Sequence, residues 1–129
     1  QGGPWPPHCV QDTPGAALHP DLELPAAAVL LSKGTDPGRD AYSAFDGTAL
    51  ATRLREAGVG RVWVGGLALD YCVRATVLDA LQEGLETRVI GPGTRAVDLQ
   101  PGDGDRARQE LEAAGALWVA AAYPEEAPC

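Results

Sequence analysis

The chain has 129 residues, of which 45% are hydrophobic, and a chain of this size can bury the core of one α/β domain. Its formal net charge of −8 argues against a nucleic-acid partner, because phosphate binding requires clustered lysine and arginine. No segment approaches the roughly 18 consecutive apolar residues of a membrane span, so we expect one domain over residues 1–129 that acts on a small molecule and not on a membrane.

The first half of the chain contains two segments with a regular pattern. Residues 1–24 are rich in proline and glycine, which predicts an irregular loop, because proline fixes the backbone and removes an amide donor. The apolar run at 26–32 predicts a strand buried on both faces, with Lys33 at its C-terminal end. Apolar spacing over 48–57 predicts a helix that ends at Gly58.

The second half alternates strands and helices. In chain order the pattern predicts a strand at 61–66, a helix at 71–83, a strand at 86–91, a helix near 105–114 and a strand at 116–121. Asp70 is a suitable N-cap for the first of these helices, and Gly84 follows its last turn. Such an order is typical of parallel β-α-β units and predicts a doubly wound, Rossmann-like sheet. Ligands of these sheets bind beyond the C-terminal ends of the strands.

The chain has three cysteines, Cys9, Cys72 and Cys129. Their odd number and irregular spacing favour neither a disulfide framework nor a cysteine zinc site, so we expect free thiols in a reducing cytoplasm. The chain begins with Gln1, and its first segment contains no basic and apolar leader, so we also expect it to lack an N-terminal part.

Two reactive residue types lie at the ends of predicted strands. Lys33 is either a solvated lysine or an ammonium group beside a nucleophile. Cys72, in the first turn of a helix, is either a small buried side chain or a nucleophile whose thiolate the helix N-terminus stabilises. Both strand ends belong to one edge of the sheet, so we expect the ammonium to lie beside the thiol and activate it.

Two further features concern the surroundings of Cys72 and a histidine near the beginning of the chain. The backbone amide of Cys72, with another from the turn at 67–69, is suited to hold an oxyanion during acyl transfer. His8 lies in a loop, where a lone histidine is usually a surface residue, and no second group of metal ligands accompanies it.

Three motifs, taken together, are specific. WPPHCVQDTPGA, SKGTDPGRDAYSAFDGT and GGLALDYCVRATVLDAL occur in this order, and they closely resemble the nicotinamidase branch of the isochorismatase-like cysteine hydrolases. The resemblance extends from Trp5 to about Val97. It implies a three-layer isochorismatase-like fold and a triad of aspartate, lysine and cysteine that hydrolyses an amide through a thioester.

The resemblance also implies a role for individual residues. Cys72 matches the nucleophile, Lys33 matches the triad lysine, and the backbone amides of Ala68 and Cys72 match the oxyanion hole. The Leu67–Ala68 bond matches a cis peptide bond of the relatives, so that Leu67 lies beside the substrate. Trp5 and Tyr42 match residues near the substrate, although Tyr42 is equally suited to anchor its own turn.

By the same resemblance, His8 of the WPPHC motif is a ligand of a divalent metal that holds a pyridine nitrogen. A histidine is compatible with zinc, iron or manganese. In the family, a first strand with the triad aspartate and a loop with the other metal ligands precede this motif. None of the three aspartates Asp12, Asp21 and Asp70 stands in the position of the triad aspartate.

The sequence therefore predicts a cysteine amidohydrolase that converts nicotinamide to nicotinate and ammonia. One alternative is a related hydrolase of another small amide or of isochorismate. A third is an inactive scaffold that retains the fold. A homo-oligomer is compatible with each of the three.

Overall fold

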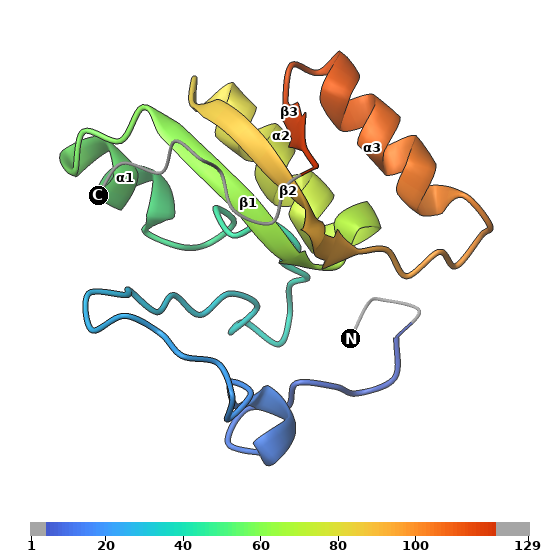
Figure 1. Cartoon of the computed structure of the whole chain (residues 1–129). Coiled ribbons are helices and arrows are strands. Elements are labelled where there is room, and N and C mark those ends of the chain that lie inside the picture. The colour runs from blue at the N-terminus through green and yellow to red at the C-terminus, as the bar shows by residue number, and fades with distance from the viewer. Residues whose placement is uncertain (1–4, 121–129) are drawn as a thin grey trace.

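The computed structural model describes residues 5–120, which form an α/β fold (Figure 1). The elements are, in chain order, η1 Pro14–Ala16, α1 Leu50–Glu56, β1 Arg61–Leu67, η2 Leu69–Val73, α2 Arg74–Gln82, β2 Glu86–Arg95, α3 Asp103–Ala113 and β3 Leu117–Val119. None of the helices formed by the described residues has the length and hydropathy needed to cross a bilayer.

The three strands make one parallel sheet in the order β1-β2-β3. Helix α2 connects β1 to β2, and α3 connects β2 to β3, so two successive β-α-β units build the sheet. The two helices pack against each other as well as against the strands, which places both on one face of the sheet (Figure 1). The predicted α/β fold with a parallel sheet is confirmed.

The hydrophobic core lies between this face of the sheet and the two helices. Buried apolar side chains come from η2, α2, β2 and α3 and from the turn before β3: Leu69, Val73, Val77, Val89, Ala107, Leu111 and Ala116. Val77, Val89 and Leu111 are fully buried. Because η2 contributes Leu69 and Val73 to this core, packing fixes the turn that carries Cys72.

The predicted elements of the second half are present, with shifted ends. Strand β2 continues past the predicted end at Gly91 as far as Arg95, with an irregular register against β1 between Val64 and Gly66. Helix α3 begins at Asp103, whose carboxylate accepts a hydrogen bond from the Gln100 amide. The last residue of the strand predicted at 116–121 lies outside the described residues.

The strand predicted at 26–32 is wrong. The Ala28 amide donates to the Pro25 carbonyl over 2.9 Å, so the run begins in a turn and continues as irregular chain. Val29 and Leu30 are 62% and 69% exposed. Figure 1 shows this part of the chain on a long path beneath the sheet. An apolar run becomes a strand only where a neighbouring strand takes up its backbone hydrogen bonds, and no described strand pairs with this one.

The predicted role of Asp70 as an N-cap is also wrong. The helical segment begins with Ala68 in the N-cap position, and its first turn, η2, is a π turn that runs into α2. No side chain caps it. The two oxygens of the Asp70 carboxylate instead accept hydrogen bonds from the amides of Val97 and Asp98, both over 2.9 Å, because the loop after β2 offers two amides together.

Candidate active site

The Lys33 ammonium lies beside the Cys72 thiol. The distance between Lys33 Nζ and Cys72 Sγ is 3.4 Å, which is a hydrogen-bonding distance for sulfur. Lys33 is on a loop and not at the end of a strand, yet the structure brings the two residues together as the sequence suggested.

Cys72 occupies the π turn η2, just beyond the C-terminal end of β1. Its side chain is half-buried and makes no disulfide. Single π turns in α-helices are often found at functional sites, because the extra residue changes the direction of one side chain. The carbonyl of Ala68 accepts hydrogen bonds from the amides of Tyr71 and Val73, over 3.1 and 3.0 Å, which holds this turn together.

Lys33 is held from a second side. Its ammonium donates to the Ala41 carbonyl over 2.9 Å in addition to contacting Cys72. No carboxylate among residues 5–120 forms a hydrogen bond or ion pair with Lys33 or Cys72, and the described part of the site therefore consists of a thiol and an ammonium. Asp70 does not complete a triad, because both of its oxygens bind backbone amides.

Three aromatic side chains meet next to Cys72. Trp5 contacts Tyr71 edge to face with ring centroids 5.1 Å apart, and Tyr42 lies 5.8 Å from Tyr71. The sequence identified Trp5 and Tyr42, and it missed Tyr71, which stands between them. Its position directly before Cys72 was the available signal. Burial, together with the nearby charges of Asp70 and Asp103, raises the pKa of Tyr71, so its phenol is neutral at physiological pH.

The residues expected to form the oxyanion hole, Ala68 and Cys72, follow the end of β1 at Leu67. The Leu67–Ala68 peptide bond is cis, as the family resemblance implied. Leu67 is 73% exposed, while Ala68 is half-buried and leads directly into η2. Ala68 lies four positions before Cys72, and both residues are at the C-terminal end of β1.

His8 is the candidate metal ligand. Its ring lies on the surface with Nδ1 2.8 Å from the Pro6 carbonyl oxygen. Among residues 5–120, no group of three or more histidine, cysteine or acidic side chains is arranged to hold a metal. The described residues alone therefore do not complete a metal site.

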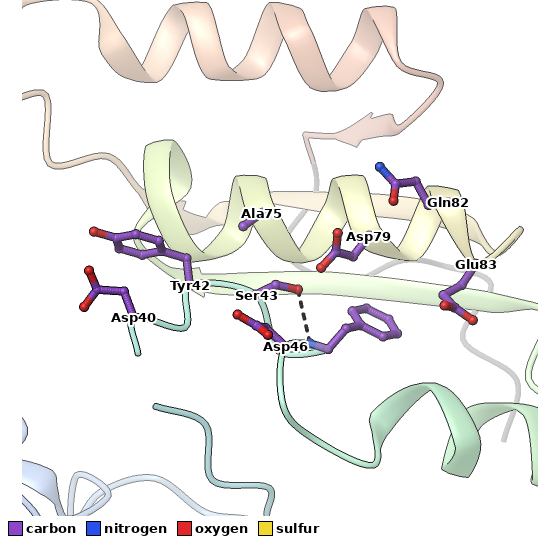
Figure 2. A pocket seen from close by; sticks show the side chains of 9 residues that line it. Asp40, Tyr42, Ser43, Asp46, Ala75, Asp79, Gln82 and Glu83 are labelled. Atoms are coloured by element: carbon purple, nitrogen blue, oxygen red, sulfur yellow. Dashed lines mark hydrogen bonds between the residues drawn. The ribbon is translucent and has the colours of Figure 1, made fainter. Parts of the chain in front are cut away.

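A separate hollow of about 390 Å³ lies between the segment at 40–46 and α2. Figure 2 shows four carboxylates around it, from Asp40, Asp46, Asp79 and Glu83. Neither Lys33 nor Cys72 lines it. An acidic wall without a thiol or a lysine is a less suitable place for nucleophilic chemistry than the contact between Lys33 and Cys72.

Several known proteins are similar to this chain in sequence and in fold. The model of the isochorismatase domain matches residues 1–119. The nicotinamidase of Escherichia coli (strain K12) is 46% identical over 128 residues, which cover 95% of this chain and 60% of that protein. The chain thus spans less than two thirds of the length of this relative.

Two solved structures have the same fold. The pyrazinamidase of Pyrococcus horikoshii in complex with zinc superposes with a TM-score of 0.84 at 47% identity, covering 91% of this chain and 63% of that one. PnC1 from L. infantum in complex with nicotinate superposes with a TM-score of 0.84 at 37% identity, covering 92% and 61%. With a family model that matches almost the whole sequence, the chain belongs to the isochorismatase family.

Proposed function

We propose that this chain is the greater part of a nicotinamidase, which hydrolyses nicotinamide to nicotinate and ammonia. The observation that carries the proposal is the contact of 3.4 Å between Lys33 Nζ and Cys72 Sγ at the end of β1. The identity of 46% to the nicotinamidase of Escherichia coli supports the choice of substrate. So does the likeness to a structure that contains nicotinate.

In the proposed reaction, the Cys72 thiolate attacks the carbonyl carbon of the amide. The carbon–nitrogen bond breaks as the leaving nitrogen takes up the proton that the Cys72 thiol gave up, so ammonia departs and a thioester remains on the sulfur. Water then cleaves the thioester, which releases the carboxylate and regenerates the thiol. Lys33 stabilises the thiolate by its charge, and the backbone amides of Ala68 and Cys72 stabilise the negative oxygen of the tetrahedral intermediates.

The aromatic cluster supplies the proposed substrate wall. A pyridine ring binds well between aromatic faces and edges, and Trp5, Tyr42 and Tyr71 provide both within contact of one another. Leu67 is 73% exposed at the same end of the sheet, where it is available to cover an apolar ring. These residues are proposed to orient the amide toward Cys72.

We further propose that His8 contributes one ligand to a divalent metal, of the kind that the pyrazinamidase of Pyrococcus horikoshii binds as zinc. When bound, such a metal would hold the substrate ring through its nitrogen. The free thiols of Cys9 and Cys72 support a reducing, cytoplasmic location.

The test is an assay of ammonia release from nicotinamide, with the protein at the full length that its gene encodes. Activity is expected in the parent and is expected to fall at least about a thousandfold in Cys72→Ser, because hydroxyl groups are poor nucleophiles without a strong base. Cys9→Ser is the matched control, since Cys9 is also a free cysteine but is exposed, and the hydrogen bonds of the Lys33 ammonium go to Ala41 and Cys72.

Two results would change the assignment. Cys72-dependent hydrolysis of other small amides, with none of nicotinamide, would make the protein a related amidohydrolase. A protein that is folded by circular dichroism but releases no ammonia from any of these amides would be an inactive member of the family.

A further inference from the structure

Thr76 makes two hydrogen bonds to segments on either side of it. Its hydroxyl donates to the Cys72 carbonyl over 2.7 Å, and it accepts from the Ala44 amide over 2.9 Å. The first bond, to the carbonyl four residues earlier, is common for threonine in helices and does not by itself indicate a special role for Thr76. The second is different, because Ala44 lies 32 positions away on the loop that precedes α1.

That loop also holds Lys33. The Ala41 carbonyl accepts from Lys33 Nζ over 2.9 Å, three residues before Ala44. The Ala44 carbonyl is fixed in turn by the Thr48 hydroxyl over 2.6 Å, and Ser43 is 5% exposed. The segment at 41–44 is therefore anchored through both the amide and the carbonyl of Ala44, and its other end sets the position of the Lys33 ammonium.

We infer that Thr76 is a positioning residue, which sets the Lys33 ammonium against the Cys72 thiol through the segment at 41–44. The inference rests on the proposed function in taking Cys72 as the nucleophile. One hydroxyl links the backbone of the nucleophile to the backbone that carries the acceptor of Lys33. Loss of this hydroxyl leaves the half-buried Ala44 amide without its acceptor, so the segment relaxes and Lys33 loses a fixed partner.

The decisive variants are Thr76→Val and Thr76→Ser. Valine has nearly the shape of threonine and lacks the hydroxyl, whereas serine keeps the hydroxyl and lacks the methyl group. We expect Thr76→Val to lower kcat for nicotinamide by about tenfold, because Lys33 loses its fixed position beside Cys72, and to raise KM as well, because Tyr42 of the substrate wall belongs to the same segment. Thr76→Ser is expected to retain most of the rate.

A second readout does not depend on the substrate. The rate of alkylation of Cys72 by iodoacetamide at pH 6, followed by mass spectrometry, is expected to fall about tenfold in Thr76→Val and to recover in Thr76→Ser. Alkylation of Cys9 in the same sample is the internal control, since Cys9 is exposed. If nicotinamide is not the substrate, the alkylation result still stands, so the two proposals can fail separately.

The route through Lys33 is tested by a double-mutant cycle. In a Lys33→Met background, Thr76→Val is expected to have no further effect on alkylation, because the ammonium that it positions is absent. An equal additional loss in that background overturns the inference, as does an unchanged alkylation rate in Thr76→Val. Should Thr76→Val fail to fold in a thermal melt, Thr76→Ala, which favours a helix, replaces it in each comparison.

Discussion

Lys33 Nζ lies 3.4 Å from Cys72 Sγ, although the two residues are 39 positions apart and Lys33 belongs to no helix or strand. The contact is held by the Ala41 carbonyl, which receives a second hydrogen bond from the same ammonium. A lysine that is already fixed at this distance stabilises a thiolate more than a mobile lysine does, because no further side-chain conformational entropy is lost when the two charges meet.

Removal of that charge should slow the reaction of the thiol. We expect Lys33→Met to lower the rate of Cys72 alkylation by iodoacetamide at pH 6 by about tenfold or more, because an ordinary cysteine is mostly protonated at that pH. The rate is measured for each cysteine by peptide mass spectrometry. Cys9, which is exposed and free, should react at its parental rate. Equal rates at Cys72 in the variant and the parent would show that the ammonium does not activate the thiol.

Asp70 should stabilise the loop after β2. Its carboxylate accepts from the amides of Val97 and Asp98, and Asp70→Asn leaves one oxygen for the two donors. We expect a loss of about 1–3 kcal/mol in the free energy of unfolding, measured with urea. Asp105→Asn, which removes an equal charge from an exposed position in α3, is the control and should change the free energy by less than about 0.5 kcal/mol.

Gly104 should resist substitution in spite of its place in a helix. It is buried in the first turn of α3, and a Cβ there would lie 2.6 Å from the Cβ of Ala96. Alanine favours a helix by about 1 kcal/mol over glycine, but overpacking against a neighbouring segment costs about 1–3 kcal/mol. We expect Gly104→Ala to lower the melting temperature, while Gln109→Ala on the exposed side of α3 should leave it nearly unchanged. A higher melting temperature for Gly104→Ala would contradict the close packing at Ala96.

The Arg74–Glu110 pair should make stability depend on pH in the acid range. Its hydrogen bond to Arg74 lowers the pKa of Glu110 below the ordinary value of 4.5. A lowered folded-state pKa stabilises the fold above that ordinary value, and the contribution is lost as the pH falls further. Since both side chains are more than 40% exposed, the contribution should be below about 1 kcal/mol.

The measurement compares urea unfolding of Arg74→Gln and the parent at pH 7 and pH 3. The difference in free energy should be present at pH 7 and should be smaller at pH 3, because the stabilisation that a lowered folded-state pKa of Glu110 provides is lost progressively as the pH falls. Arg53→Gln, at an exposed position of α1, is the control. A difference that is as large at pH 3 as at pH 7 would assign the role of Arg74 to packing and not to charge.

The strands and helices of the second half follow from local sequence. β1, β2 and β3 each contain a short apolar run, and a glycine follows the helices before β2 and β3, so the pattern allows few other secondary structures there. The same reasoning failed for 26–32, where a turn after Pro25 begins the run and no described strand lies beside it. Apolar composition indicates that a segment can be buried, whereas its pairing with another strand depends on which segments lie beside it in space.

The sequence also predicted part of the candidate site. The position of Cys72 at the start of a helix, after an apolar strand, can be read from about ten neighbouring residues, and the three motifs assign the family. The partners of Asp70 could not be predicted, because a capping role and a loop contact both satisfy a carboxylate and only the path of the loop distinguishes them. Tyr71 was missed for the same reason, since its contacts with Trp5 and Tyr42 join three distant segments.

The sequence by itself determined the α/β class, the parallel direction of β1, β2 and β3, and the placement of a thiol where a strand passes into a helix, because these depend on periodicity and turn residues within short windows. The sequence also predicted Lys33 beside that thiol, but only the tertiary structure decided how the two residues are held and which other groups lie around them. The contacts Lys33–Cys72, Thr76–Ala44 and Asp70–Val97 join positions 39, 32 and 27 residues apart. Such contacts depend on how the loops close around the core, and no local pattern in the chain encodes that closure.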